Sequence, residues 1–257
     1  MLDKITPVIL TYNEEPNIAR VLEKLDWAGE IVVVDSFSSD GTLSILRTHP
    51  KVRLLQRKFD TFARQWNFAL AQVRTDWVLS LDADYVLSGE LVREMSGLSG
   101  ASDVSAYSAR FDYSIFGKPL RTSLMPPRHI LFRRDRASYF DDGHTQRLKV
   151  LGAEACLEGR VNHDDRKPLS RWLASQSRYA QDEAVKLRTT PFSRLPLQDK
   201  VRRCIFLAPP LILFYCLFVK GLILDGWRGI YYSLQRMSAE ACLSAQLILS
   251  AFKGEKR

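Results

Sequence analysis

The sequence predicts an α/β fold built on a largely parallel sheet and followed by a helical extension. Apolar runs alternate with segments of helical periodicity over residues 1–85, and two of those runs end at an acidic residue. Strands and helices that alternate at such spacings favour a parallel sheet with right-handed crossovers. The 257 residues allow one domain of this kind, which we place at 1–167, and an appendage at 168–257.

Four apolar runs are the predicted strands of the sheet. They cover residues 5–10, 30–35, 52–55 and 77–85. Because Pro7 has no backbone N–H, the first run is predicted to be an edge strand or to place Pro7 at a strand start. Helices predicted from apolar residues at helical spacing cover 18–25, 42–48 and 61–73. Asp60 and Thr61 are suited to cap the last of these.

After residue 85 the pattern changes to a helix over 89–98 and to strands over 107–113 and 128–133. The strand at 128–133 alternates in polarity, which is typical of a half-exposed strand. Arg128, Arg133 and Arg134 could contact the phosphates of a charged acceptor, or could simply be solvated strand charges.

The run at 77–85 ends in two carboxylates, Asp82 and Asp84. If the strand continues to its end, both side chains point the same way, because strand side chains alternate with a period of two. Two such carboxylates provide half a site for Mg²⁺ or Mn²⁺, at the strand tip where ligands of open α/β sheets bind. The alternative is a polar turn that closes the strand.

The charge balance is basic, with 37 Lys and Arg against 29 Asp and Glu. This excess suits nucleic acid, anionic lipid or a phosphorylated substrate, and does not separate them. The four cysteines lack Cys-x-x-Cys spacing and are expected to be reduced thiols of a cytosolic protein. The N-terminal residues lack a signal-peptide pattern, so we expect the first domain to stay in the cytosol.

The appendage combines a basic segment with an apolar one. Residues 186–203 hold six basic residues and one acid, and residues 205–219 carry no charge. A helix that restarts at Pro209-Pro210 and continues to Leu224 is too short for a bilayer core of about 30 Å. We therefore expect it to lie in the membrane interface, with the basic segment on anionic head groups. The alternative is a buried helix of a soluble core. A last helix is predicted at 234–252.

Four groups of residues along the chain resemble the motifs of a known enzyme family. They are Thr11-Tyr12-Asn13-Glu14-Glu15, Val34-Asp35-Ser36 with Ser38-Ser39-Asp40-Gly41-Thr42, Arg64 with Asn67, and Leu81-Asp82-Ala83-Asp84. In this order they resemble the family 2 glycosyltransferases of the GT-A fold, and most closely the bacterial lipopolysaccharide-core branch. The tail resembles that branch in Arg171-Trp172, Gln176, Tyr179, Glu183, Lys220-Gly221 and Asp225-Gly226. The resemblance covers nearly the whole chain.

The resemblance implies a nucleotide-sugar donor and assigns residues to it. Thr11, Glu14 and Asp35 would contact the base and the ribose, although Asp35 could instead cap the turn after its strand. Asp82 would face the ribose or the metal ion. Arg64 would approach the diphosphate, or would be a solvated helix charge.

The resemblance also implies a divalent metal ion, Mg²⁺ or Mn²⁺, that neutralises the diphosphate as it leaves. Asp82 and Asp84 would be its carboxylate ligands. His163 or His144 could complete the ligand set, since neutral imidazole binds such ions. We favour His163, because it ends a strand-like run.

The general base is the role least well matched by the motifs. Transfer to a hydroxyl with inversion needs a carboxylate that accepts the proton of the acceptor. Relatives often show His-Glu-Arg-Leu where this chain has Thr145-Gln146-Arg147-Leu148. Gln146 cannot act as a base. Asp142, and next to it Asp141, are therefore the candidates, with a plain Asp-Gly turn as the alternative.

These observations predict an inverting, metal-dependent glycosyltransferase at the cytoplasmic face of the bacterial inner membrane. It would move a hexose, most simply glucose from UDP-glucose, to a lipid-linked saccharide such as a lipopolysaccharide core. The alternatives are a polyprenyl phosphate acceptor, a non-catalytic nucleotide-sugar-binding membrane module, and a nucleotidyltransferase. The expected partners are the donor, a lipid-linked or phosphorylated acceptor and an anionic membrane surface, without nucleic acid. A homo-oligomer is left open.

Overall fold

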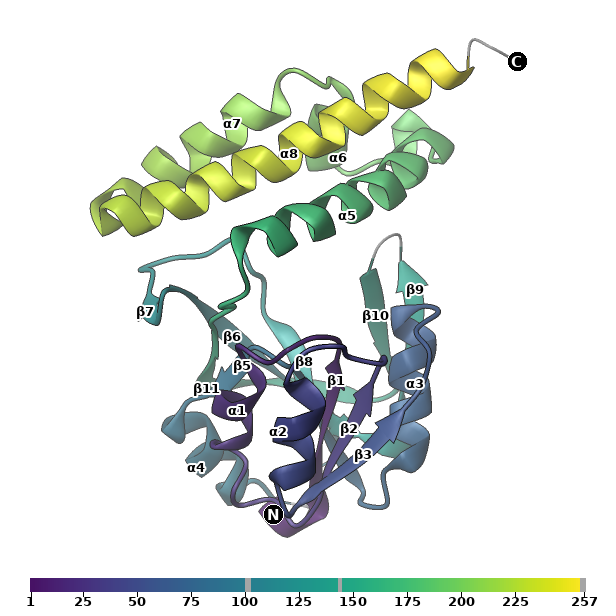
Figure 1. The fold of residues 1–257 in the computed structure, drawn as a ribbon, viewed down its shortest axis with the longest axis vertical. Helices are drawn as coiled ribbons and strands as arrows, with labels where there is room; N and C mark the ends of the chain where they lie inside the picture. The colour runs from purple at the N-terminus through teal and green to yellow at the C-terminus, as the bar shows by residue number, and fades with distance from the viewer. Residues whose placement is uncertain (100–102, 143–144, 255–257) are drawn as a thin grey trace. The chain divides into compact units, whose positions relative to one another are not determined.

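The main sheet begins with four parallel strands. In the computed structural model, which describes residues 1–99, 103–142 and 145–254, their order is β3, β2, β1, β4. The first three are labelled in Figure 1. The strands are β1 (Ile5–Thr11), β2 (Ile31–Asp35), β3 (Val52–Gln56) and β4 (Trp77–Asp82). The predicted α/β fold with its parallel strands is therefore confirmed.

Pro7 does not place β1 at the edge of the sheet, and that prediction is wrong. β1 pairs with β4 on one side and with β2 on the other. The pairing with β2 begins only at Val8, opposite Val32. Pro7 therefore lies where β1 has a neighbour on one side, and its missing N–H breaks no hydrogen bond of the ladder.

The sheet continues past β4 as β8, β6, β11 and β5, with the short β7 paired to β6. These strands are β5 (Tyr85–Leu87), β6 (Val104–Ile115), β7 (Lys118–Pro119), β8 (Arg128–Arg133) and β11 (Ala153–His163). β8 is antiparallel to both β4 and β6, whereas β6 and β11 are parallel. β11 therefore runs in the direction of β4, and both strands end at the same edge of the sheet.

Helices cover both faces of the sheet. Successive side chains of a strand point to opposite faces, and the buried strands carry apolar side chains on both. Ile9 packs in the cluster that includes side chains of α1, α2 and α4. Val8 packs with Trp66 of α3, which shares its face with Tyr139 of the β9–β10 hairpin. The elements are α1 (Ile18–Leu22), α2 (Thr42–Thr48), α3 (Phe62–Gln72), α4 (Gly89–Gly97), β9 (Ala137–Asp142) and β10 (Thr145–Val150). Thr61 caps α3 through the backbone N–H of Arg64, as predicted.

The chain divides into two compact units. The catalytic unit, as we name it here, contains residues 1–119 and 124–167, and the helical unit contains 120–123 and 168–257. The helices of the second unit are α5 (Leu169–Thr189), α6 (Leu197–Arg203), α7 (Ala208–Phe214) and α8 (Trp227–Gly254). Within this unit α5 and α7 flank the long α8 (Figure 1). Ala180, Ala184 and Leu187 of α5 bury their side chains against Leu243 and Leu247 of α8.

The apolar segment after residue 205 is broken where one continuous helix was predicted. α7 passes into a π-helical turn (Tyr215–Val219), and the chain then turns at Gly221 with φ of 69°. That left-handed conformation is easy only for glycine, and it ends the helix before Leu224. The last helix starts at Trp227 and not at Leu234. In the described part of the chain we find no helix with both the length and the apolar character that crossing a membrane requires.

Candidate active site

Four strand ends bring the polar residues of the catalytic unit to one edge of the sheet. Thr11 at the end of β1 lies beside Asp35 at the end of β2, and Asp82 ends β4 beside Leu10. His163 ends β11, opposite Tyr85. Residues that are far apart in sequence therefore meet at the carboxyl edge of the parallel strands, where α/β folds bind ligands.

The positions of Asp82 and Asp84 differ from the prediction, because only Asp82 belongs to the strand. β4 ends at Asp82, and Asp84 lies in the turn before β5, so strand alternation does not set its direction. The backbone of the turn places Asp84 instead, since its carbonyl accepts the N–H of Asp164 at 3.2 Å. Its carboxylate Oδ2 lies 3.1 Å from Nε2 of His163. The structure thus brings two of the three residues predicted to bind metal, Asp84 and His163, into contact, and Asp82 ends β4 just before this turn.

Burial and mutual charge set the protonation of these three residues. Burial and the neighbouring Asp84 charge raise the pKa of Asp82. Burial alone would also raise the pKa of Asp84, but the close His163 lowers it to about 2. Burial opposes the charged imidazole of His163, yet the Asp84 carboxylate outweighs burial and raises the His163 pKa. The turn therefore carries an ionised Asp84 in contact with His163, beside an Asp82 that is costly to ionise.

The residue types at this turn suit a hard divalent cation, but they do not form a finished cage. Nδ1 of His163 is buried without a hydrogen-bond partner, and the rings of Tyr85 and Tyr113 meet the imidazole edge-on. Within the described ranges, no three His, Cys, Asp or Glu side chains converge closely enough to hold a metal ion. His144, the other proposed ligand, lies outside the described residues.

Asp35 has the capping arrangement that was the alternative to nucleotide contact. Its carboxylate is wholly buried, and it accepts hydrogen bonds from Thr11 Oγ1 at 2.9 Å and from the Ser38 N–H at 2.8 Å. These bonds hold the loop after β2 against the loop after β1. The Asn13 N–H donates to Ser38 Oγ at 2.7 Å and completes the link. Direct contact of Thr11 or Asp35 with a nucleoside stays a prediction.

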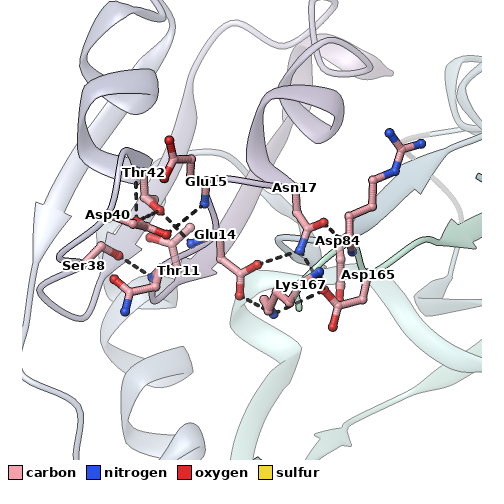
Figure 2. Close-up of polar contacts among 12 residues, drawn as sticks. Thr11, Glu14, Glu15, Asn17, Ser38, Asp40, Thr42, Asp84, Asp165 and Lys167 are labelled. Carbon is pink, nitrogen blue, oxygen red and sulfur yellow. Dashed lines mark hydrogen bonds and ion pairs between the residues drawn. The ribbon is translucent and has the colours of Figure 1, made fainter. Parts of the chain in front are cut away.

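Glu14 belongs to a network that the sequence did not reveal. Its Oε1 lies 2.7 Å from Nζ of Lys167, and its Oε2 accepts a hydrogen bond from Asn17 Nδ2 at 3.0 Å (Figure 2). Burial raises the pKa of Glu14 to about 7, although Lys167 counteracts this effect. Lys167 lies near more than one carboxylate, so its charge only partly compensates the burial of Glu14.

We expect Glu14→Gln to stabilise the fold more at pH 8 than at pH 5. The pKa of Glu14 rises from 4.5 to about 7 on folding, so the folded protein holds this proton more tightly than the unfolded chain. Stability contributed by the proton is present below pH 4.5 and is lost as the pH rises toward about 7. Glutamine never ionises and does not suffer this loss. The gain in free energy of unfolding from the substitution should therefore be about 1–3 kcal/mol larger at pH 8 than at pH 5. Urea unfolding of both proteins at the two pH values measures the difference, and an equal difference at both would contradict the prediction.

The arginines occupy different parts of the catalytic unit. Arg128 lies at the site, where its Nη1 donates to the Tyr85 hydroxyl at 3.3 Å and its charge counteracts the raised pKa of Asp82. Arg133 is at the other end of the sheet, opposite Trp77 at the start of β4, with its guanidinium over the Trp77 ring. Arg134 follows it there. Arg133 and Arg134 therefore lie away from this edge, and their contact with acceptor phosphates stays a prediction.

Arg64 is exposed on the first turn of α3, 3.6 Å from Asp60. This is the solvated helix position that was the alternative to diphosphate contact. Its approach to a diphosphate stays a prediction.

Asp141 and Asp142 lie on the β9–β10 hairpin. Asp141 Oδ1 accepts the N–H of Ala63 at 3.3 Å, at the start of α3. Asp142 Oδ2 lies 2.6 Å from Nε of Arg147 on the paired strand. Neither of these contacts reaches Asp82 or Asp84, so a base role for either residue stays a prediction.

Sequence reasoning missed the segment that follows His163. Asp164 is buried and accepts hydrogen bonds from Arg20 Nη1 at 2.6 Å and Arg166 Nε at 2.9 Å. The charge density of His163-Asp164-Asp165-Arg166-Lys167 was the available signal. A run of mixed charges usually indicates a solvated loop, and here it docks onto α1.

Comparison with known proteins gives a family and a fold. Residues 6–149 match the family model described as Glycosyl transferase family 2. An uncharacterized glycosyltransferase of Rickettsia typhi is 33% identical over 109 residues, covering 42% of this chain and 37% of the relative. The lipopolysaccharide core biosynthesis glycosyltransferase LpsC of Rhizobium meliloti is 32% identical over 103 residues, covering 38% of each. The chain thus matches well under half the length of these curated relatives.

Among solved structures, the mannosyltransferase PcManGT from Pyrobaculum calidifontis aligns with a TM-score of 0.55. The alignment covers 96% of this chain and 87% of that one, at 19% identity. A similarity at this level of identity supports a shared fold.

Proposed function

Because this chain belongs to glycosyl transferase family 2, whose model spans residues 6–149, we propose that it transfers a hexose from a nucleotide-diphosphate donor with inversion. Glucose from UDP-glucose is the simplest donor, and the acceptor is a lipid-linked saccharide such as a lipopolysaccharide core. The observation that carries this proposal is the contact of Asp84 with His163 beside Asp82, at the carboxyl edge of the parallel strands. The similarity to LpsC supports the acceptor class.

Metal dependence is part of the proposal. Asp82 and Asp84 supply carboxylate oxygens, and His163 supplies an imidazole whose Nδ1 is buried without a partner. This donor set fits Mg²⁺ or Mn²⁺. A cation bound there would neutralise the charge that develops on the diphosphate as it leaves. The PcManGT structure was determined with GDP-mannose and Mn²⁺.

The proposal has two possible acceptor chemistries, which Asp142→Asn distinguishes. A sugar hydroxyl must lose a proton, so a base such as Asp142 is needed, and its loss should slow transfer about 10²–10⁴-fold. A polyprenyl phosphate is already anionic and needs no base, so the variant would keep near-full turnover. The measurement compares turnover of the variant and the wild type on each acceptor. Lys149→Ala, on the same hairpin, controls for damage to the hairpin.

We further propose that the enzyme works at the cytoplasmic face of the bacterial inner membrane and attaches through its helical unit. The segment from just before α7 to the start of α8 exposes many large apolar side chains. Few of its residues are buried, among them Cys216 and Leu222. The membrane face, as we name it here, consists of Phe206, Leu207, Leu211, Phe214, Tyr215, Phe218, Val219, Ile223, Leu224, Trp227, Ile230 and Leu234. Exposed apolar surfaces of this kind mark sites of association.

The charge of the helical unit supports an anionic membrane as the partner. The helical unit has 15 Lys and Arg against six Asp and Glu, an excess of nine positive charges. The catalytic unit has 22 against 23 and is nearly neutral. Arg228 lies over the ring of Trp227 and Lys220 over that of Tyr215. Such pairs of cations and aromatic rings suit the head-group level of a bilayer.

A donor screen tests the proposed reaction. The full chain is mixed with UDP-glucose, UDP-N-acetylglucosamine or GDP-mannose, with Mn²⁺ or with EDTA, and release of the nucleoside diphosphate is followed. We expect one of the donors to release its nucleoside diphosphate with Mn²⁺, and none of them to do so with EDTA. A nucleotidyltransferase would instead release pyrophosphate from a nucleoside triphosphate and a sugar phosphate, so UTP with glucose 1-phosphate is tested in parallel. Tight donor binding without turnover on any lipid-linked acceptor would favour the non-catalytic module.

A further inference from the structure

Lys167 places a positive charge among the acidic residues of the site. Its Nζ lies 2.7 Å from Glu14 Oε1 and 3.7 Å from Asp165 Oδ1 (Figure 2). Its side chain is only 18% exposed. A lysine on a free surface would hold no such fixed position, because its four-carbon stem has many conformers.

The side chain of Asn17 keeps this arrangement in place. Its Nδ2 donates to Glu14 Oε2 at 3.0 Å and to Asp165 Oδ1 at 2.9 Å. Its Oδ1 accepts from the Arg166 N–H and from Arg20 Nη2, both at 2.9 Å. The amide thereby uses both of its donors and both of its acceptor positions. Asn17 is buried, so the bonds tie the start of α1 firmly to the segment that ends at Lys167.

The ammonium group of Lys167 stays charged and acts on the turn that contains Asp84. Burial would lower the pKa of Lys167, but Asp84, Glu14 and Asp165 outweigh it and raise the pKa. In turn, Lys167 contributes to the lowered pKa of Asp84. Lys167 and Asp84 are therefore close enough for their charges to interact.

A diphosphate that approaches this edge meets several carboxylates and needs a cation beside them. We propose that Lys167 is a donor-binding residue whose ammonium group contacts the diphosphate of the nucleotide sugar, with Glu14 and Asp165 as its counter-ions when no donor is bound. This inference rests on the proposed function. A lysine suits the role because its ammonium is a compact point charge that binds phosphate oxygens.

The test compares binding of UDP and of uridine to the wild type and to Lys167→Met, by calorimetry with EDTA and with Mn²⁺. GDP and guanosine are measured in parallel, because the base is not established. Methionine keeps an apolar stem of similar length and removes the charge. We expect the diphosphate to bind about 10–100-fold more weakly, with the nucleoside affinity unchanged. Lys24→Met, an exposed lysine just beyond α1, should change neither affinity.

Three results would overturn the inference. Unchanged diphosphate affinity in a folded Lys167→Met protein would exclude the contact while leaving the proposed function intact. Equal weakening of diphosphate and nucleoside would make Lys167 a structural residue only. A wild type that binds neither diphosphate would overturn the proposed function together with this inference.

A second measurement on the wild type covers the case in which Lys167→Met does not fold. An amine-modifying reagent is applied with and without the nucleotide, and modification of Lys167 is read by mass spectrometry. The diphosphate should protect Lys167, whereas the nucleoside should not. Equal modification in all samples would contradict the contact.

Discussion

Replacing Asp84 with asparagine is expected to lower the rate of sugar transfer by about 100-fold or more. The substitution is nearly isosteric and keeps an oxygen near Nε2 of His163, which now lies 3.1 Å from Oδ2. It removes the negative charge that both the metal ion and the imidazole would use. We expect the apparent affinity for Mn²⁺ to fall with the rate, because the charge of Asp84 contributes to both.

Asp76→Asn is the matched control for this substitution. Asp76 precedes the same strand at its opposite end, next to Trp77. The control should keep the wild-type rate and metal dependence. Rates are measured over a range of Mn²⁺ concentrations, with unfolding midpoints to show that both proteins are folded. An Asp84→Asn protein that supports full cellular function would favour the non-catalytic module.

Replacing Phe214 and Phe218 with serine is expected to weaken binding to anionic vesicles by about 100-fold. The two rings lie 5.0 Å apart on the membrane face, and each side chain is more than half exposed. Full burial of such a side chain contributes about 1.5–3 kcal/mol. Because the rings are exposed in the protein itself, the double variant should keep its unfolding midpoint and its turnover of a soluble acceptor.

The control for the membrane face lies on the other flank of α8. Leu173 and Val185 are exposed on α5, and the double serine variant there should bind vesicles like the wild type. Binding is measured by co-sedimentation with vesicles that contain an anionic lipid and with neutral vesicles. The basic helical unit predicts weaker binding to the neutral ones. Equal losses from both double variants would show that general apolar exposure, and not this face, drives association.

The parallel direction of the first strands and the acidic residues at their ends could be predicted from local pattern, whereas the order of the strands in the sheet was not predicted. Helix 42–48 was predicted with the bounds that the structure has, and strand 30–35 was predicted to begin one residue early. Short-range forces decide these features: apolar periodicity selects strand or helix, and a capping side chain such as Thr61 starts α3. Because parallel strands share one carboxyl edge, acids at two strand ends already placed Asp35 and Asp82 together.

The contacts within the site depended on residues that are distant in sequence. The carboxylate of Asp84 meets His163, 79 residues away, and Asn17 holds Asp165 across 148 residues. A pattern of single residues does not reveal which partner a buried polar group finds, because that choice follows from how strands and loops pack. For the same reason the sequence did not show that the Asp35 carboxylate accepts hydrogen bonds from Thr11, at the end of β1, and from Ser38, in the loop after β2.

For this protein, the sequence by itself determined the α/β unit, the acidic strand ends and the basic, apolar appendage, since these follow from composition and periodicity along the chain. Tertiary structure alone decided that Asp84 is held by a turn, that Lys167 is locked beside Glu14 through Asn17, and that the helix after Pro209-Pro210 stops at Gly221. Burial is the physical reason. It makes every unpaired polar group costly, so the packed chain selects the partners that satisfy them. The edge predicted from Asp82 and Asp84 thereby gains a fixed lysine.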